Sequence, residues 1–139
     1  MPDWVCPKCG RQLRIRNQEH TCQLYHLESH FKGKPPICRE AFDWMVDQLD
    51  RSGPYDVLPL KTMIAFAHQG NFAFLTTRKS GATIHLVLSS EFVSERAVQK
   101  VPYSSSTAIF RIPISQGGDL DSEIAGWLEI AYHRRQSHA

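Results

Sequence analysis

The sequence of 139 residues lacks the features that mark several large classes of protein. No apolar run approaches the roughly 20 residues that a membrane-spanning helix needs. It contains no Walker loop, no dinucleotide-binding glycine fingerprint and no G-x-S-x-G nucleophile motif. Internal repeats and low-complexity tracts are absent too. These absences disfavour a membrane protein and the commonest nucleotide-binding and serine-hydrolase classes.

Cysteine is also scarce, with four in the chain, but three of the four lie within residues 6–22. Thiols clustered in this way, without an extracellular context, indicate metal-bound thiolates in a reducing compartment rather than disulfides. Pro2, Asp3 and a cysteine pair stand where a signal peptide would have its apolar core. We therefore expect a cytoplasmic protein.

Charge of either sign is modest overall, at a net +2, but it is unevenly distributed. Residues 1–40 contain seven Lys and Arg against four acidic residues, and residues 41–139 contain nine against ten. A basic first part predicts an anionic partner, although a solvated basic surface is the simpler alternative.

The motif Cys6-x2-Cys9 is typical of a zinc knuckle, because two cysteines separated by two residues place both thiolates on one ion. A redox CxxC pair should instead follow a strand and open the helix of a βαβ unit, and no such unit surrounds the motif. Zinc needs two more ligands, and the spacing leaves two pairs open. One is His20-x-Cys22 and the other is Cys22-x3-His26. Four protein ligands leave no open coordination position, so we expect a structural zinc.

The remaining sequence predicts an α+β fold, with a small N-terminal zinc knuckle followed by a helix–antiparallel sheet–helix domain. We assign a zinc-knuckle head to 1–26 and a connector to 27–36. Apolar residues recur with helical spacing over 37–52 and again over 119–134. Short β-rich segments lie within 55–113, joined by turns that are too short for parallel crossovers. Both helices should then cover one face of the sheet, over a core that we expect to include Trp44, Met45, Leu49, Phe66, Phe74, Leu86, Leu88, Ile124, Trp127 and Leu128.

A series of motifs along the chain resembles an uncharacterised bacterial family, domain of unknown function 5655 (DUF5655), in a version that begins with a zinc knuckle. The motifs are "CPKCG", "RNQEHTC", "HFKGKPP", "LPLKTMIAF", "NFAF" and "DLDSEIAGWLEIAY". The resemblance implies a Q-x-H-x-C second pair, and hence zinc ligands Cys6, Cys9, His20 and Cys22 with His26 as a spare. It implies no activity, because none is established for the family.

The sequence departs from the family pattern at two places. Gln69 stands where relatives tend to carry arginine, and Thr107 and Ala108 stand where relatives have histidines. Any role of those basic residues in relatives is therefore in doubt for this chain.

Two functions of different classes fit these residues. In the first, which we prefer, the protein is not an enzyme and its head binds DNA or RNA through Lys8, Arg11, Arg14 and Arg16, with Lys61 as a further anion-binding candidate. In the second, Lys61, His85 and Arg78 line the pocket of a small-ligand-binding or enzymatic domain. A protein–protein interaction module is a third possibility.

Overall fold

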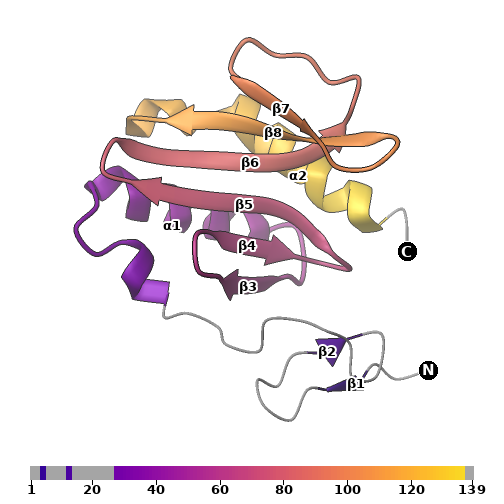
Figure 1. The fold of residues 1–139 in the computed structure, drawn as a ribbon, viewed down its shortest axis with the longest axis horizontal. Helices are drawn as coiled ribbons and strands as arrows, with labels where there is room; N and C mark the ends of the chain where they lie inside the picture. Colours follow the sequence, from indigo (N-terminus) through magenta and orange to yellow (C-terminus); the bar gives the residue numbers. More distant parts are fainter. Residues whose placement is uncertain (1–3, 6–11, 14–26, 137–139) are drawn as a thin grey trace.

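The computed structural model describes residues 4–5, 12–13 and 27–136, with side chains from Leu27 to His133 (Figure 1). The first strands, β1 (Trp4–Val5) and β2 (Gln12–Leu13), pair antiparallel with each other. The helices are η1 (Leu27–His30), α1 (Pro36–Asp50), η2 (Gly117–Asp119) and α2 (Ser122–Gln136). The remaining strands are β3 (Asp56–Pro59), β4 (Ile64–Ala67), β5 (Asn71–Arg78), β6 (Gly81–Ser89), β7 (Gln99–Pro102) and β8 (Thr107–Ile114).

Strands β3 to β8 form one antiparallel sheet in the order β3-β4-β5-β6-β8-β7. The α+β class and the antiparallel sheet are thus confirmed, and tight hairpin turns at Gln69-Gly70-Asn71 and at Lys79-Ser80 join β4 to β5 and β5 to β6. Strand β7 was not predicted from the sequence. This edge strand is short and exposed, and its lysine and proline give it no apolar alternation to detect.

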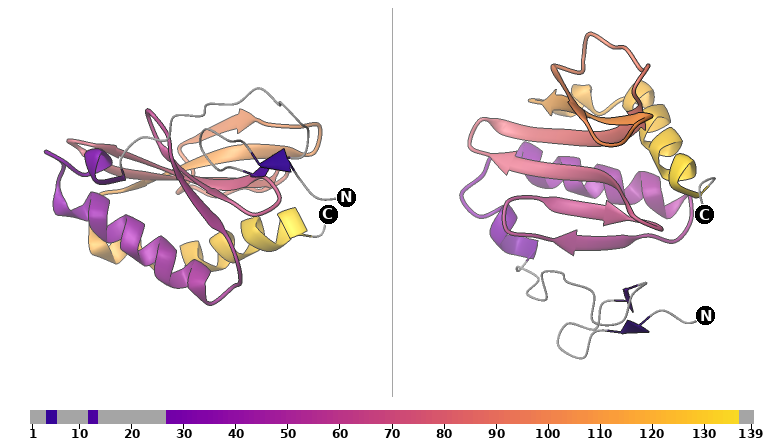
Figure 2. Two further views of the ribbon diagram at one scale, coloured as in Figure 1. Left: turned by 90° about the horizontal axis from the view of Figure 1, so that it is seen from below. Right: turned by 45° about the vertical axis from the view of Figure 1, so that its right-hand side comes forward.

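Helices α1 and α2 cover the same face of the sheet (Figure 2). Helix α1 begins with Pro36, at a position where proline loses no hydrogen bond, and it ends before Gly53, whose φ of 144° disfavours any side chain. The carboxylate of Asp121 accepts from the amide of Ile124 and so caps α2. No helix in the described part of the chain is long and apolar enough to cross a membrane.

The core between helices and sheet contains most of the residues expected there, but Phe74 is an exception. A β-bulge between Phe66 and Ala67 lets Phe72 and Ala73 both join the helix-side core. Phe74 therefore pairs with Ala65 on the opposite face and is only partly buried. The two tryptophans of the predicted core, Trp44 and Trp127, pack at its margin and are partly buried as well.

Two polar contacts join distant segments of the fold. The guanidinium of Arg96 donates to Asp121 and Glu123 and to the carbonyl of Asp119, which fastens the β6–β7 loop to the start of α2. The hydroxyl of buried Tyr132, near the end of α2, donates to the carbonyl of Pro54 at 2.9 Å.

Candidate anion-binding surface at one end of the sheet

Two hairpin turns meet at one end of the sheet and carry three basic residues. The β3–β4 turn is closed by the amide of Leu60 donating to the carbonyl of Met63 at 2.8 Å, and Lys61 lies within it. The β5–β6 turn is closed by the Arg78–Gly81 pair and contains Lys79. Because Ile64, the first residue of β4, pairs with Leu75, the turn that precedes it lies beside the last residues of β5, which end at Arg78.

The segment before α1 is bound to the same end of the sheet. The Nε2 atom of His30 lies 2.7 Å from the carbonyl oxygen of Leu60, and the hydroxyl of Thr77 donates to the carbonyl of His30. The ammonium of Lys34 donates to the carbonyl of Thr77 at 3.3 Å. These contacts bring two more lysines to the turns and form a surface that we call the basic end, made of Lys32, Lys34, Lys61, Arg78 and Lys79.

The cations of the basic end have no acidic partners among the described residues. The arginines that do form ion pairs with described carboxylates are Arg39, Arg51 and Arg96. Within the described part of the chain, no carboxylate lies within ion-pair distance of any residue of the basic end. Unneutralised cations gathered on one surface produce a positive potential that attracts anions.

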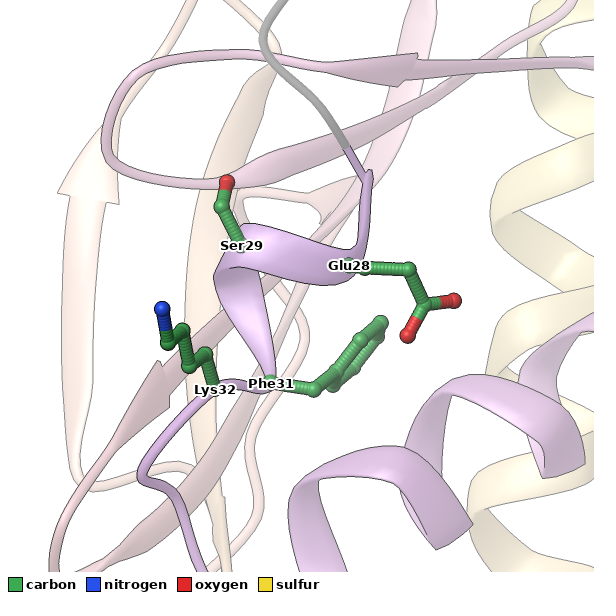
Figure 3. A pocket seen from close by; sticks show the side chains of 4 residues that line it. All are labelled: Glu28, Ser29, Phe31 and Lys32. Carbon is green, nitrogen blue, oxygen red and sulfur yellow. The ribbon is translucent and has the colours of Figure 1, made fainter.

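A shallow depression lies next to the basic end, and its described lining is Glu28, Ser29, Phe31 and Lys32 (Figure 3). Glu28 and Phe31 point towards α1, whereas Lys32 points to the other side of the segment. Arg39 of α1 donates to both oxygens of Glu28 at 2.7 and 2.9 Å, and its guanidinium lies 5.0 Å from the centre of the Phe31 ring. The carboxylate is therefore neutralised, and the contact holds the segment that carries Lys32 and Lys34.

His85 lies in the middle of the sheet, on the face without helices. It is 7% exposed, and its Nε2 atom is 3.1 Å from the hydroxyl oxygen of Thr76. Burial, together with the positive charges of Arg111 and Arg78, lowers the pKa of His85 to about 4. The imidazole is thus neutral at pH 7.

The predicted site residues are only partly brought together. Arg78 and His85 share a face of the sheet, whereas Lys61 lies at the turn beyond them. The other cations of the basic end, and Arg111, were not singled out from the sequence as binding residues. The sequence gives little sign of them. The "KGK" stretch lies in the predicted connector after the head, and the arginine of "FRI" alternates with apolar residues, as an ordinary strand residue does.

The predicted zinc ligands Cys6, Cys9, His20 and Cys22, with the spare His26, lie outside the described residues. So do the basic head residues Lys8, Arg11, Arg14 and Arg16. In the described part of the chain there is no cluster of three or more residues able to hold a metal ion. The described pairing of Val5 with Gln12 does show that six residues, Cys6 and Cys9 among them, join two antiparallel strands.

Comparison with known proteins identifies the family of the domain just described. The family model "Domain of unknown function (DUF5655)" matches residues 27–134. The chain belongs to this family. No curated protein and no solved structure matches the chain. The matched residues span η1 to α2, so the DUF5655 domain includes the whole basic end and the six-stranded sheet.

Proposed function

We propose that this DUF5655 protein is a non-enzymatic, zinc-containing protein that binds nucleic acid through its phosphate backbone. The observation that carries the proposal is the basic end, where five cations gather without acidic partners among the described residues. Lysine and arginine side chains of this kind displace counterions from phosphates, which is the main source of sequence-independent affinity. The four basic residues of the head add a second contact of the same chemistry.

The zinc belongs to the same proposal, with Cys6, Cys9, His20 and Cys22 as its ligands. Four ligands of this type suit a tetrahedral structural zinc. The β1–β2 pairing supports it, because only six residues, which include Cys6 and Cys9, separate Val5 from its partner Gln12. Such a frame would hold the basic side chains of the head in place and reduce the entropy that they lose on binding phosphate.

The chemistry of His85 favours binding over catalysis. A general base works best when its pKa lies near the pH of the reaction, and the pKa of His85 is lowered to about 4 by burial and two arginines. Its described hydrogen-bond partner is the hydroxyl of Thr76 rather than a carboxylate that would orient and charge the imidazole. A pocket enzyme built on Lys61 and His85 is therefore the weaker candidate.

The proposal is tested by binding labelled DNA and RNA to the full chain over a range of salt concentrations. Neutralising five phosphates at the basic end contributes about −3.5 to −4.5 to the slope of log affinity on log salt, and four phosphates at the head contribute about −2.8 to −3.6 more. The double variant Lys61→Glu, Arg78→Glu should bind more weakly, with a slope shallower by about two. Arg14→Glu, Arg16→Glu tests the head in the same way.

Arg51→Glu is the matched control for charge reversal. Arg51 follows the C-terminal end of α1, a helix of 15 residues whose first turn adjoins the basic end, so it lies about 20 Å away. Its reversal should leave the salt slope unchanged. Absence of DNA and RNA binding by the unaltered protein at low salt would refute the proposal and favour a protein partner.

A further inference from the structure

One face of the six-stranded sheet is covered by no helix of the described part (Figure 2), and its side chains include a continuous row across the strands. We call it the open face. Cross-strand pairing connects one residue from each of the six strands into this row. In sheet order the row is Leu58, Ala65, Phe74, His85, Arg111 and Gln99. Five steps of about 4.8 Å make it roughly 24 Å wide.

The centre of the row consists of three flat groups side by side. Phe74 pairs with His85, and His85 pairs with Arg111, so neighbouring Cβ atoms are about 5 Å apart. The side chain of Arg111 is held in place by donation to the side-chain oxygen of Gln99. Phe74 is partly exposed and lies outside the helix-side core, so its ring is accessible on the open face.

The open face is also poor in negative charge. Across strands β3 to β8 the one acidic residue is Asp56, at the start of the edge strand β3. Arg78 and Arg111 lie on the open face by register, and Arg78 belongs to the basic end as well. A ligand on this face therefore meets a flat, partly aromatic surface that continues directly into cations.

We propose that the open face binds the unpaired bases of single-stranded nucleic acid, with Phe74 as the stacking residue and the basic end taking the adjoining phosphates. This inference rests on the proposed function and specifies its substrate class. A duplex hides the faces of its bases, whereas a single strand can lay them on an aromatic or guanidinium plane. Phe74 and Arg111 are the partly exposed flat groups of the row, with the buried His85 between them, and each can take one base in the way of sheet-based RNA-binding domains.

The inference is tested by fluorescence anisotropy of the full chain with 20-nucleotide oligo-dT and oligo-rU and with a 20-base-pair duplex, all at one salt concentration. The single strands should bind at least about tenfold more tightly than the duplex. Phe74→Leu should weaken single-strand binding about 5- to 100-fold, the range for loss of one stacked base, and should leave duplex binding unchanged. Phe74→Tyr, which keeps the ring, should restore the affinity.

Phe92→Leu is the matched control, because Phe92 packs on Phe110 and Trp127 away from the open face. It should lower thermal stability without changing affinity for the oligonucleotides. If Phe74→Leu fails to fold, Phe74→Trp decides the matter. The fluorescence of the introduced indole should be quenched by a saturating single-stranded oligonucleotide and not by the duplex. Unquenched fluorescence would refute the inference.

The outcomes separate this inference from the proposed function. Equal affinity for single strands and duplex, unaffected by Phe74→Leu, would overturn the inference and leave backbone binding intact. No binding to any of the probes would overturn both. Size exclusion could also show the unaltered protein as a dimer and Phe74→Leu as a monomer, with unchanged oligonucleotide affinity. That result would show that a second copy covers the open face, and it would overturn the inference.

Discussion

Mild acid should destabilise the domain through His85. The group is almost fully buried, and burial together with Arg111 and Arg78 lowers its pKa from 6.5 to about 4. In the unfolded chain the imidazole returns to its ordinary pKa, so between pH 6.5 and pH 4 the unfolded state binds a proton that the folded state does not. The free energy of unfolding therefore falls as the pH is lowered through this range. Above pH 6.5 the contribution is fully present.

The size of the effect follows from the difference in pKa. A shift from 6.5 to about 4 corresponds to about 3 kcal/mol between neutral and strongly acidic solution, of which about 2 kcal/mol is already lost at pH 5. The carboxylates of Asp119 and Asp121 have pKa values lowered below their ordinary 3.8 by hydrogen bonds, Asp119 from backbone amides and Asp121 from Arg96. Both carboxylates therefore stay ionised from pH 7 to pH 5, and comparison with a variant that lacks the imidazole assigns the effect in that window to His85.

The assay is urea unfolding followed by circular dichroism at pH 7, 6 and 5, for the unaltered protein and for His85→Gln. The amide keeps a hydrogen-bonding group but does not titrate, so His85→Gln should lose about 2 kcal/mol less than the unaltered protein between pH 7 and pH 5. The head is common to both proteins and its contribution cancels. Thr76→Val is the matched control, because it removes the hydrogen bond at 3.1 Å and leaves the titrating group in place. Parallel pH profiles for the unaltered protein and His85→Gln would refute the reasoning.

Three further predictions concern the head and the two contacts between distant segments. Metal analysis should find one zinc per chain, and Cys22→Ser should abolish zinc binding. Chelation should unfold the head, because metal binding and folding are coupled in such a small module. The circular dichroism of the six-stranded domain should persist. Arg96→Met should lower the free energy of unfolding by about 1 to 2 kcal/mol, since it removes two carboxylate contacts and a bond to a carbonyl. Arg51→Met, which removes only an exposed pair with Asp47, should cost less than about 0.5 kcal/mol in the same urea titration, and equal costs for the two variants would contradict this. Tyr132→Phe should cost about 1 kcal/mol, because it leaves the carbonyl of Pro54 without its donor, and an unchanged urea midpoint would contradict that bond.

The sequence by itself determined the local elements and their class. Apolar residues at helical spacing, with proline before α1 and an aspartate cap before α2, define two amphipathic helices from neighbouring residues alone. The turns at Gln69-Gly70-Asn71 and Lys79-Ser80 are also local, and they are too short for anything but antiparallel pairing. These signals depend on contacts within a few residues, which is why they can be read without the fold.

Tertiary structure alone decided which side chains share a surface. The alternation of apolar residues along β5 does not say which face receives Phe74, because a single bulge opposite Phe72 reverses the assignment. The basic end likewise brings Lys34 to Thr77, 43 residues away in the sequence, through a contact that no local pattern encodes. The deep burial of His85, and with it the lowered pKa, depends on strands β5 and β8 packing on either side of β6. The charge around a site and the burial of its side chains depend on such distant neighbours, so both are set only once the chain has folded.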